Sequence, residues 1–189
     1  MRVLPVVLLV LLVAAGLGLQ QHLTRQIDLE GPHVLAAASD GGFYLATGTR
    51  LYRLDERERV VARYEAAQLG VGRFDSLLAG TQGRLWVYDS EARRVLVCDL
   101  PVPCTPFDAG QTAFSANAIL AERPAGQGLL LSDNRHHRLQ ALDAQGQVQS
   151  HPLQTGWRFP NQISAWQGDW LLADTDRRQL VKLVADAQG

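Results

Sequence analysis

The strongest constraint on the fold is an internal repeat. Four glycines, each standing just before a short apolar run, recur at intervals of about 40 to 45 residues. Each copy also contains turn residues on both sides of its apolar run, so it reads as strand, turn, strand, turn, strand. The glycines and their runs are Gly42 with 43–45, Gly83 with 85–87, Gly128 with 129–131, and Gly168 with 170–172.

A fixed offset accompanies the repeat. In three copies an Asp follows the run, and an apolar residue that begins the next strand comes six positions later; the first copy carries residues 47–49, Thr-Gly-Thr, instead. Apolar residues at the first and fourth positions of that strand lie on opposite faces, so both faces are expected to be buried. The pattern predicts an all-β propeller of about four blades. The expected blades are residues 33–69, 70–112, 113–156 and 157–189.

The N-terminus carries a targeting segment. Arg2 precedes an unbroken apolar run over residues 3–19, which as a helix covers about 26 Å. We predict that residues 1–25 form a single transmembrane anchor. A cleaved secretory signal is the alternative, although no clean Ala-x-Ala site is present. The positive charge on the short N-terminal side places residues 26–189 outside the cytoplasm, on the periplasmic face of an inner or plasma membrane.

Charge and cysteine content restrict the partners and the compartment. A net charge of −1 over 189 residues gives no electrostatic basis for binding nucleic acid. Cys98 and Cys104 bracket a short loop with two prolines, which predicts a disulfide in an oxidising compartment. The alternative is a buried free Cys98.

Residues 131–146 resemble an NHL repeat, with Asp133, His137, Arg138 and Gly146 on the matching positions. The resemblance spans residues 34–189, strong in two copies and weak in the first. It implies a β-propeller used mainly for binding, since only a minority of such proteins are similar to lyases or lactonases.

The repeated polar residues are assigned to turns. His136 and His137 are adjacent, and adjacent strand residues point different ways, so the pair is a poor chelate. The Asp series fits turns in which a carboxylate satisfies loop amides. The residues given this structural role are Asp89, Asp133, His137, Arg138 and Asp174.

Two Asn residues stand just before a predicted strand. Asn161 follows Phe-Pro, and Asn117 lies in a looser copy of that segment. The first is similar to the metal-binding Pro-Asn turn of the lactonase and strictosidine-synthase-like propellers, where the Asn oxygen coordinates a divalent cation such as calcium. The candidate binding residues are Asn117, Trp157, Arg158 and Asn161.

These features favour a membrane-anchored, extracytoplasmic module for protein interaction or assembly, with no catalytic residue, metal or cofactor assigned. The alternative is a metal-assisted hydrolase or lyase, with Asn161 as a ligand. We also expect residues 26–30 to complete the outer edge of the fourth blade. If the chain is part of a longer propeller, those residues would instead close a later blade.

Overall fold

The computed structural model describes residues 34–107, 114, 118–123, 127–149 and 156–184. The chain divides into two compact units, Met1–Glu30 and Gly31–Gly189, and all described residues belong to the second. The predicted anchor, residues 1–25, and the predicted closing strand, residues 26–30, lie outside the described residues. Within the described segments, no helix has the length and apolar character needed to cross a membrane.

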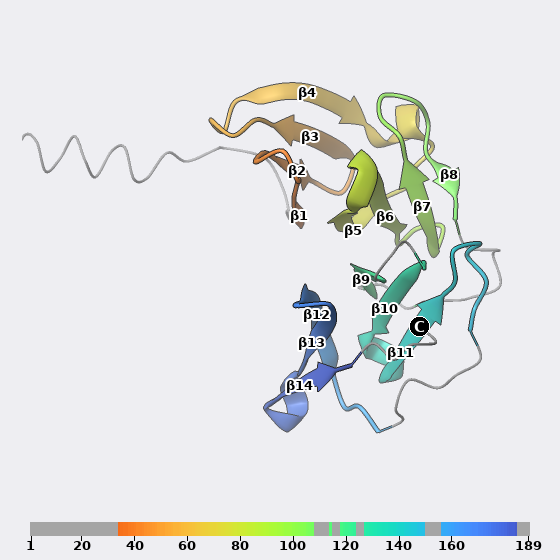
Figure 1. The fold of residues 1–189 in the computed structure, drawn as a ribbon. Helices are drawn as coiled ribbons and strands as arrows, with labels where there is room; N and C mark the ends of the chain where they lie inside the picture. Colours follow the sequence, from red (N-terminus) through yellow and green to blue (C-terminus); the bar gives the residue numbers. More distant parts are fainter. Residues whose placement is uncertain (1–33, 108–113, 115–117, 124–126, 150–155, 185–189) are drawn as a thin grey trace, which may run out of the picture. The chain divides into compact units, whose positions relative to one another are not determined.

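The described residues form four antiparallel sheets, each inside one of the four expected ranges (Figure 1). The first two sheets have four strands and the last two have three. Their strands are β1 (Val34–Ala37), β2 (Phe43–Ala46), β3 (Arg50–Leu54), β4 (Val60–Glu65); β5 (Phe74–Ala79), β6 (Leu85–Asp89), β7 (Arg94–Cys98), β8 (Thr105–Pro106); β9 (Ala118–Glu122), β10 (Leu129–Asp133), β11 (Arg138–Leu142); and β12 (Pro160–Trp166), β13 (Asp169–Asp174), β14 (Gln179–Leu183). Short 3₁₀ turns are η1 (Ala66–Leu69), η2 (Thr81–Gly83), η4 (Asn134–His136) and η5 (Thr175–Arg177).

The apolar runs form the second strand of each sheet. In β6 and β10 every residue is buried, because both faces of the sheet are covered. The repeated Asp is the last residue of β6, β10 and β13, and it pairs directly with the first residue of the following strand. The six-residue offset in the sequence therefore corresponds to one repeated hairpin.

The core consists of three layers between neighbouring sheets. The first lies between the β1–β4 and β5–β8 sheets and includes Leu51 and Leu85. The second joins Trp86 and Tyr88 to the β9–β11 sheet, and the third joins that sheet to β12–β14 through Trp170. Each inner sheet thus contributes side chains from both faces, which explains why apolar residues do not simply alternate with polar ones.

The outer edge of the third sheet carries no fourth strand within the described residues 147–149. Within the described part of that segment the pairing is a single bridge between Leu142 and Val148. Its pattern, Gln-Val-Gln, supplies only Val148 to the apolar layer. A single apolar anchor explains the short pairing.

Candidate functional site

The first strands of the four sheets line one cavity. Neighbouring strands contact each other in the order β1, β5, β9, β12. The cavity has a volume of about 440 Å³ and is lined by all of β1 together with residues 76–79, 119–122 and 162–165. The repeat brings together segments that lie about 40 residues apart in the sequence.

Small and aliphatic side chains dominate this cavity. Its polar side chains are Ser76, Glu122, Gln162 and Ser164. Leu35, on β1, is 62% exposed and is the most exposed large apolar side chain among the lining residues. Such a lining favours apolar groups of a ligand and offers few polar groups to orient a reaction.

Glu122 is the only carboxylate among the lining residues, and both its side-chain carboxylate and its backbone carbonyl accept hydrogen bonds within the protein. Its carboxylate accepts hydrogen bonds from the Thr81 backbone N–H at 2.8 Å and from the Thr81 hydroxyl at 3.0 Å. Its backbone carbonyl accepts a bond from the Trp170 indole at 3.2 Å. Glu122 therefore links the second, third and fourth sheets. Elsewhere in the described segments, too, no three His, Cys, Asp or Glu residues gather in a way that could hold a metal ion.

Asp89 and Asp174 hold the loops that lead into the first strands. The Asp89 carboxylate accepts bonds from the backbone N–H groups of Gly72 (2.9 Å) and Arg73 (3.1 Å). Asp174 accepts equivalent bonds from the backbone of Arg158 (3.2 Å) and Phe159 (2.7 Å). Both side chains are fully buried. Both carboxylates accept from backbone amides of these loops, and Asp174 also lies 3.8 Å from the Arg177 guanidinium.

Asp133 bonds to side chains of its own turn. Its carboxylate lies 2.8 Å from Nδ1 of His136 and 3.0 Å from the guanidinium of Arg138. His137 donates instead from Nδ1 to the carbonyl of Arg158, which joins the third sheet to the loop before the fourth. The two adjacent His residues thus serve different partners.

The three predicted binding residues that the structure describes, Trp157, Arg158 and Asn161, do not line the cavity. Trp157 is buried in the layer between the third and fourth sheets, and Arg158 is exposed in the loop before β12. Asn161 is exposed on β12 at an irregularity in its pairing with β13. Asn117 lies outside the described residues. The signal that would have located the cavity is the strand preceding each repeated glycine, since these strands form its wall.

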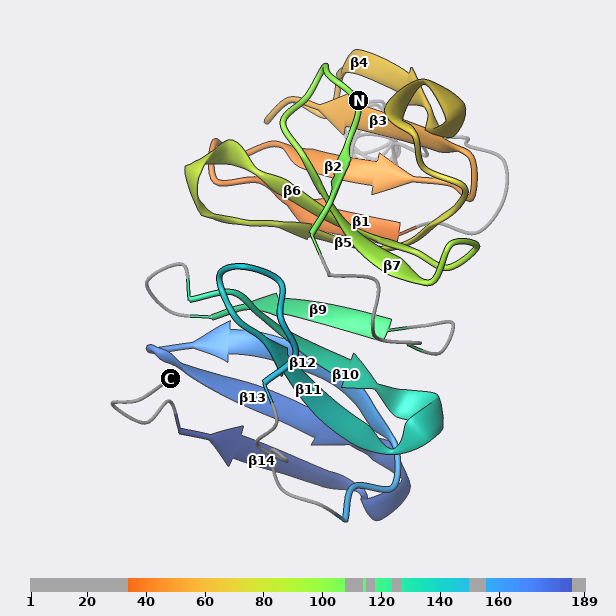
Figure 2. The ribbon, with the colours of Figure 1, turned by 90° about the vertical axis from the view of Figure 1, so that its right-hand side faces the viewer.

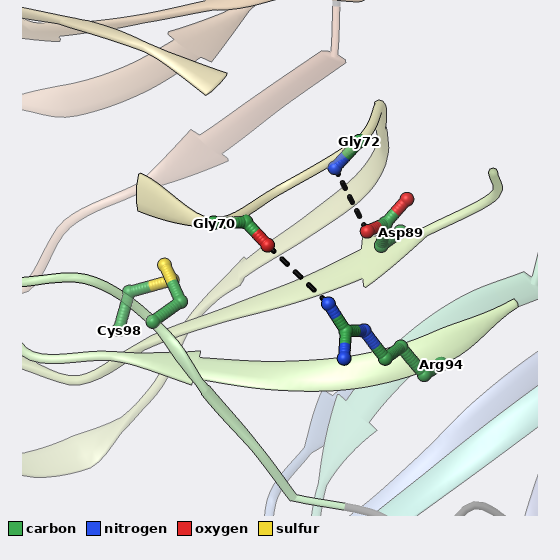
Figure 3. The surroundings of a disulfide bond; sticks show 6 residues. Gly70, Gly72, Asp89, Arg94 and Cys98 are labelled. Carbon is green, nitrogen blue, oxygen red and sulfur yellow. Dashed lines mark hydrogen bonds between the residues drawn. A yellow bond between two sulfur atoms is a disulfide. The ribbon is translucent and has the colours of Figure 1, made fainter. Parts of the chain in front are cut away.

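The predicted disulfide is confirmed. Cys98 ends β7 and is bonded to Cys104, with their Cα atoms 4.2 Å apart (Figure 3). The backbone N–H of Cys104 donates to the carbonyl of Leu69 at 2.9 Å. Beside this bridge, the Arg94 guanidinium donates to the carbonyl of Gly70 (Figure 3). These contacts attach the second sheet to the segment that follows the first.

Comparison with known proteins supports the fold through structure alone. No family model matches the sequence, and no curated protein matches it. A solved streptogramin B lyase is similar with a TM-score of 0.61 and 15% identity, over 82% of this chain and 55% of that one. Virginiamycin B lyase from Staphylococcus aureus gives 0.58 and 11%, over 85% and 58%. A protein of unknown function from Bacteroides caccae gives 0.60 and 14%, over 88% and 62%.

These neighbours are β-propeller proteins, and the chain has a propeller-like fold built from four antiparallel sheets. It spans little more than half the length of the two lyases. At these identities the likeness concerns the fold only.

Proposed function

We propose that the protein is a binding module for protein interaction or assembly, and that the cavity lined by β1, β5, β9 and β12 receives an apolar segment of its partner. The observation that carries this proposal is the apolar cavity wall with the exposed Leu35. Fully burying a Leu side chain contributes roughly 1.5 to 3 kcal/mol, so Leu35 is an anchor that a bound segment would cover. Propeller proteins include binding proteins, one neighbour being described as an auxiliary nutrient binding protein from Bacteroides thetaiotaomicron.

The proposed address is the extracytoplasmic face of a membrane, with the N-terminal segment as the anchor. Its support is the apolar run over residues 3–19 and the disulfide, because disulfides persist in oxidising compartments. We also propose that the repeats are of the NHL type. Support for this is the turn that carries Asp133, His137 and Arg138 at the positions of that motif.

The binding role is tested by site-specific photo-crosslinking in cells that produce the full chain. A benzophenone amino acid at position 35 should yield a discrete crosslinked protein. The matched control is position 102, where Val102 is similarly exposed but lies in the loop after β7. Crosslinks of equal yield at both positions, or none at position 35, would contradict the proposal.

The alternative function is a metal-assisted hydrolase or lyase. Its support is that two of the structural neighbours are lyases. Elemental analysis of the purified full chain separates the two. Stoichiometric calcium or zinc that is lost in an Asn161→Ala variant would favour the alternative. Metal content that does not depend on Asn161 would leave the binding role as the better account.

A further inference from the structure

The three repeated hairpins lie at one end of their sheets. Figure 2 shows the β6–β7, β10–β11 and β13–β14 turns on the same side. Hydrogen bonds tie the neighbouring loops to these hairpins: the Ser90 N–H donates to the carbonyl of Arg73, and His137 donates to the carbonyl of Arg158. Residues on these loops therefore share a surface, which we call the arginine end.

The arginine end carries exposed guanidinium groups that have no acidic partner in the part of the chain that the structure describes. They come from the two loops that precede β5 and β12 and from the three hairpins. Arg94, Arg138 and Arg177 at this end are different, because each contacts a backbone carbonyl or a buried Asp. The five groups in question are Arg73, Arg93, Arg135, Arg158 and Arg178.

Nearby acids do not neutralise this set. Asp89, Asp133 and Asp174 are fully buried, and their carboxylates are bonded to the loops and to residues of their own turns. The exposed acids on the hairpins are Glu91 and Asp176. Among the described residues of this end, the five exposed guanidinium groups therefore face two exposed carboxylates. Asp75, near the start of β5, is half-buried and has an interaction of its own.

The backbone gives a second, independent observation. Arg93, His137 and Arg178 occupy the same hairpin position with φ of 53°, 55° and 55°. Glycine adopts this left-handed conformation freely, whereas other L-residues are disfavoured there by about 1 kcal/mol or more. The turn geometry thus does not require a basic residue, yet Arg stands at two of the three positions. The third, His137, is bonded to the carbonyl of Arg158.

We propose that the arginine end binds an acidic segment of a partner protein. A guanidinium presents a planar fork of donors that matches a carboxylate bidentately. The five groups are distributed over separate loops, which suits several carboxylates along a polypeptide better than one compact anion. This surface is separate from the cavity, whose lining residues lie further along β5, β9 and β12 than the ends next to the hairpins.

The test uses the full chain in neutral detergent and a fluorescein-labelled octaglutamate peptide as probe, followed by fluorescence anisotropy at low salt. Binding is expected, and it should weaken as salt is added because the charges are exposed. An octalysine peptide should not bind. Failure of octaglutamate to bind the wild-type chain would overturn the proposal.

A double variant locates the site. Arg93→Gly with Arg178→Gly removes two charges at positions where glycine is unstrained, so folding is retained. We expect binding to weaken about tenfold, since losing one exposed charge pair weakens binding by up to about fivefold and the variant loses two. The matched control is Arg57→Gln with Arg84→Gln, which makes the same charge change on exposed loops at the opposite end. The control should change binding less than about twofold.

Further arms separate the acidic segment from other anions. Replacing Arg93 and Arg178 by Lys keeps the charge but removes the planar fork, so binding should fall between that of the wild type and that of the glycine pair. Equal weakening in the glycine pair and in the control pair would show non-specific attraction and overturn the site. Binding to anionic lipid vesicles without binding to octaglutamate would also overturn the proposal in favour of a membrane surface.

Discussion

Removing the Asp89 carboxylate should destabilise the propeller in a graded way. Four backbone N–H groups donate to this side chain: Arg73, Glu91 and Ala92 to Oδ1 and Gly72 to Oδ2. Because Asp89 is fully buried, an Ala at this position leaves those donors without their acceptor. We expect Asp89→Ala to lower the free energy of unfolding by about 3 kcal/mol, the cost of leaving one or two of the donors unsatisfied after the others find water.

Asp89→Asn should cost less than Asp89→Ala. A carboxamide keeps one oxygen, which can take the three bonds now made by Oδ1, while its NH₂ group faces the Gly72 N–H. One lost bond to a charged acceptor predicts a loss of about 1 to 2 kcal/mol. The control is Asp143→Asn, in a turn where the carboxylate accepts from Gln145 and Gln147 near the surface. Water can replace those bonds, so its cost should stay below about 1 kcal/mol.

Urea unfolding of the detergent-solubilised full chain, followed by tryptophan fluorescence and extrapolated linearly, measures these differences. The expected order of stability loss is Asp89→Ala, then Asp89→Asn, then Asp143→Asn. Equal losses of unfolding free energy in the two Asp89 variants would refute this explanation, because the expected difference comes from the number of backbone amides that keep an acceptor.

Three further perturbations have expected outcomes. Cys98→Ala should lower the free energy of unfolding by about 2 kcal/mol, and reductant should cause the same loss in the wild type but none in the variant. Leu139→Ala, at a buried position, should lower the free energy of unfolding by about 3 kcal/mol, whereas Leu180→Ala, at the equivalent exposed position, should lower it by less than about 0.5 kcal/mol. Similar losses in the two variants would contradict the layer assignment. The hydrogen bond from Arg53 lowers the pKa of Asp40. The stability that this bond contributes is therefore present above the pKa of the carboxyl in the unfolded chain and is lost as pH falls through its pKa in the folded protein. Arg53→Gln should raise the pKa of Asp40 in an NMR titration, and an unchanged pKa would contradict the assignment.

Local chemistry made parts of the structure predictable from sequence. The six-residue offset after each Asp predicts a hairpin, and Asp89, Asp133 and Asp174 each end a strand that pairs with the next. The disulfide was predictable for the same reason, since Cys98 and Cys104 are close in the chain and the loop between them is short. Both inferences depend only on contacts between residues that are near in sequence.

The cavity could be predicted only from the repeat as a whole, because no short segment contains it. Its wall needs four strands from four repeats, and each of them alone, such as Val34–Ala37, has no distinctive residue. The candidate binding residues chosen by residue type lie away from the cavity: Trp157 packs in a core layer, and Asn161 lies at an irregularity in the pairing of β12 with β13. The predicted binding residues were chosen by residue type, whereas the cavity is formed by the first strand of each repeat, whatever its residue types.

The last sheet shows why a repeat in sequence fixes position but not burial. Leu51, Val95 and Leu139 are each the second residue of the third strand of their sheets and are 0%, 0% and 5% exposed, while Leu180 at the same position is 69% exposed. The registers are equivalent, since each residue lies next to the repeated hairpin. The difference is the neighbour: in the first three sheets a following sheet contributes to the covering layers, whereas no described element covers the Leu180 side of β12–β14. Burial in this fold is therefore conferred by the adjacent repeat, and identical sequence patterns have different energetic consequences in different sheets.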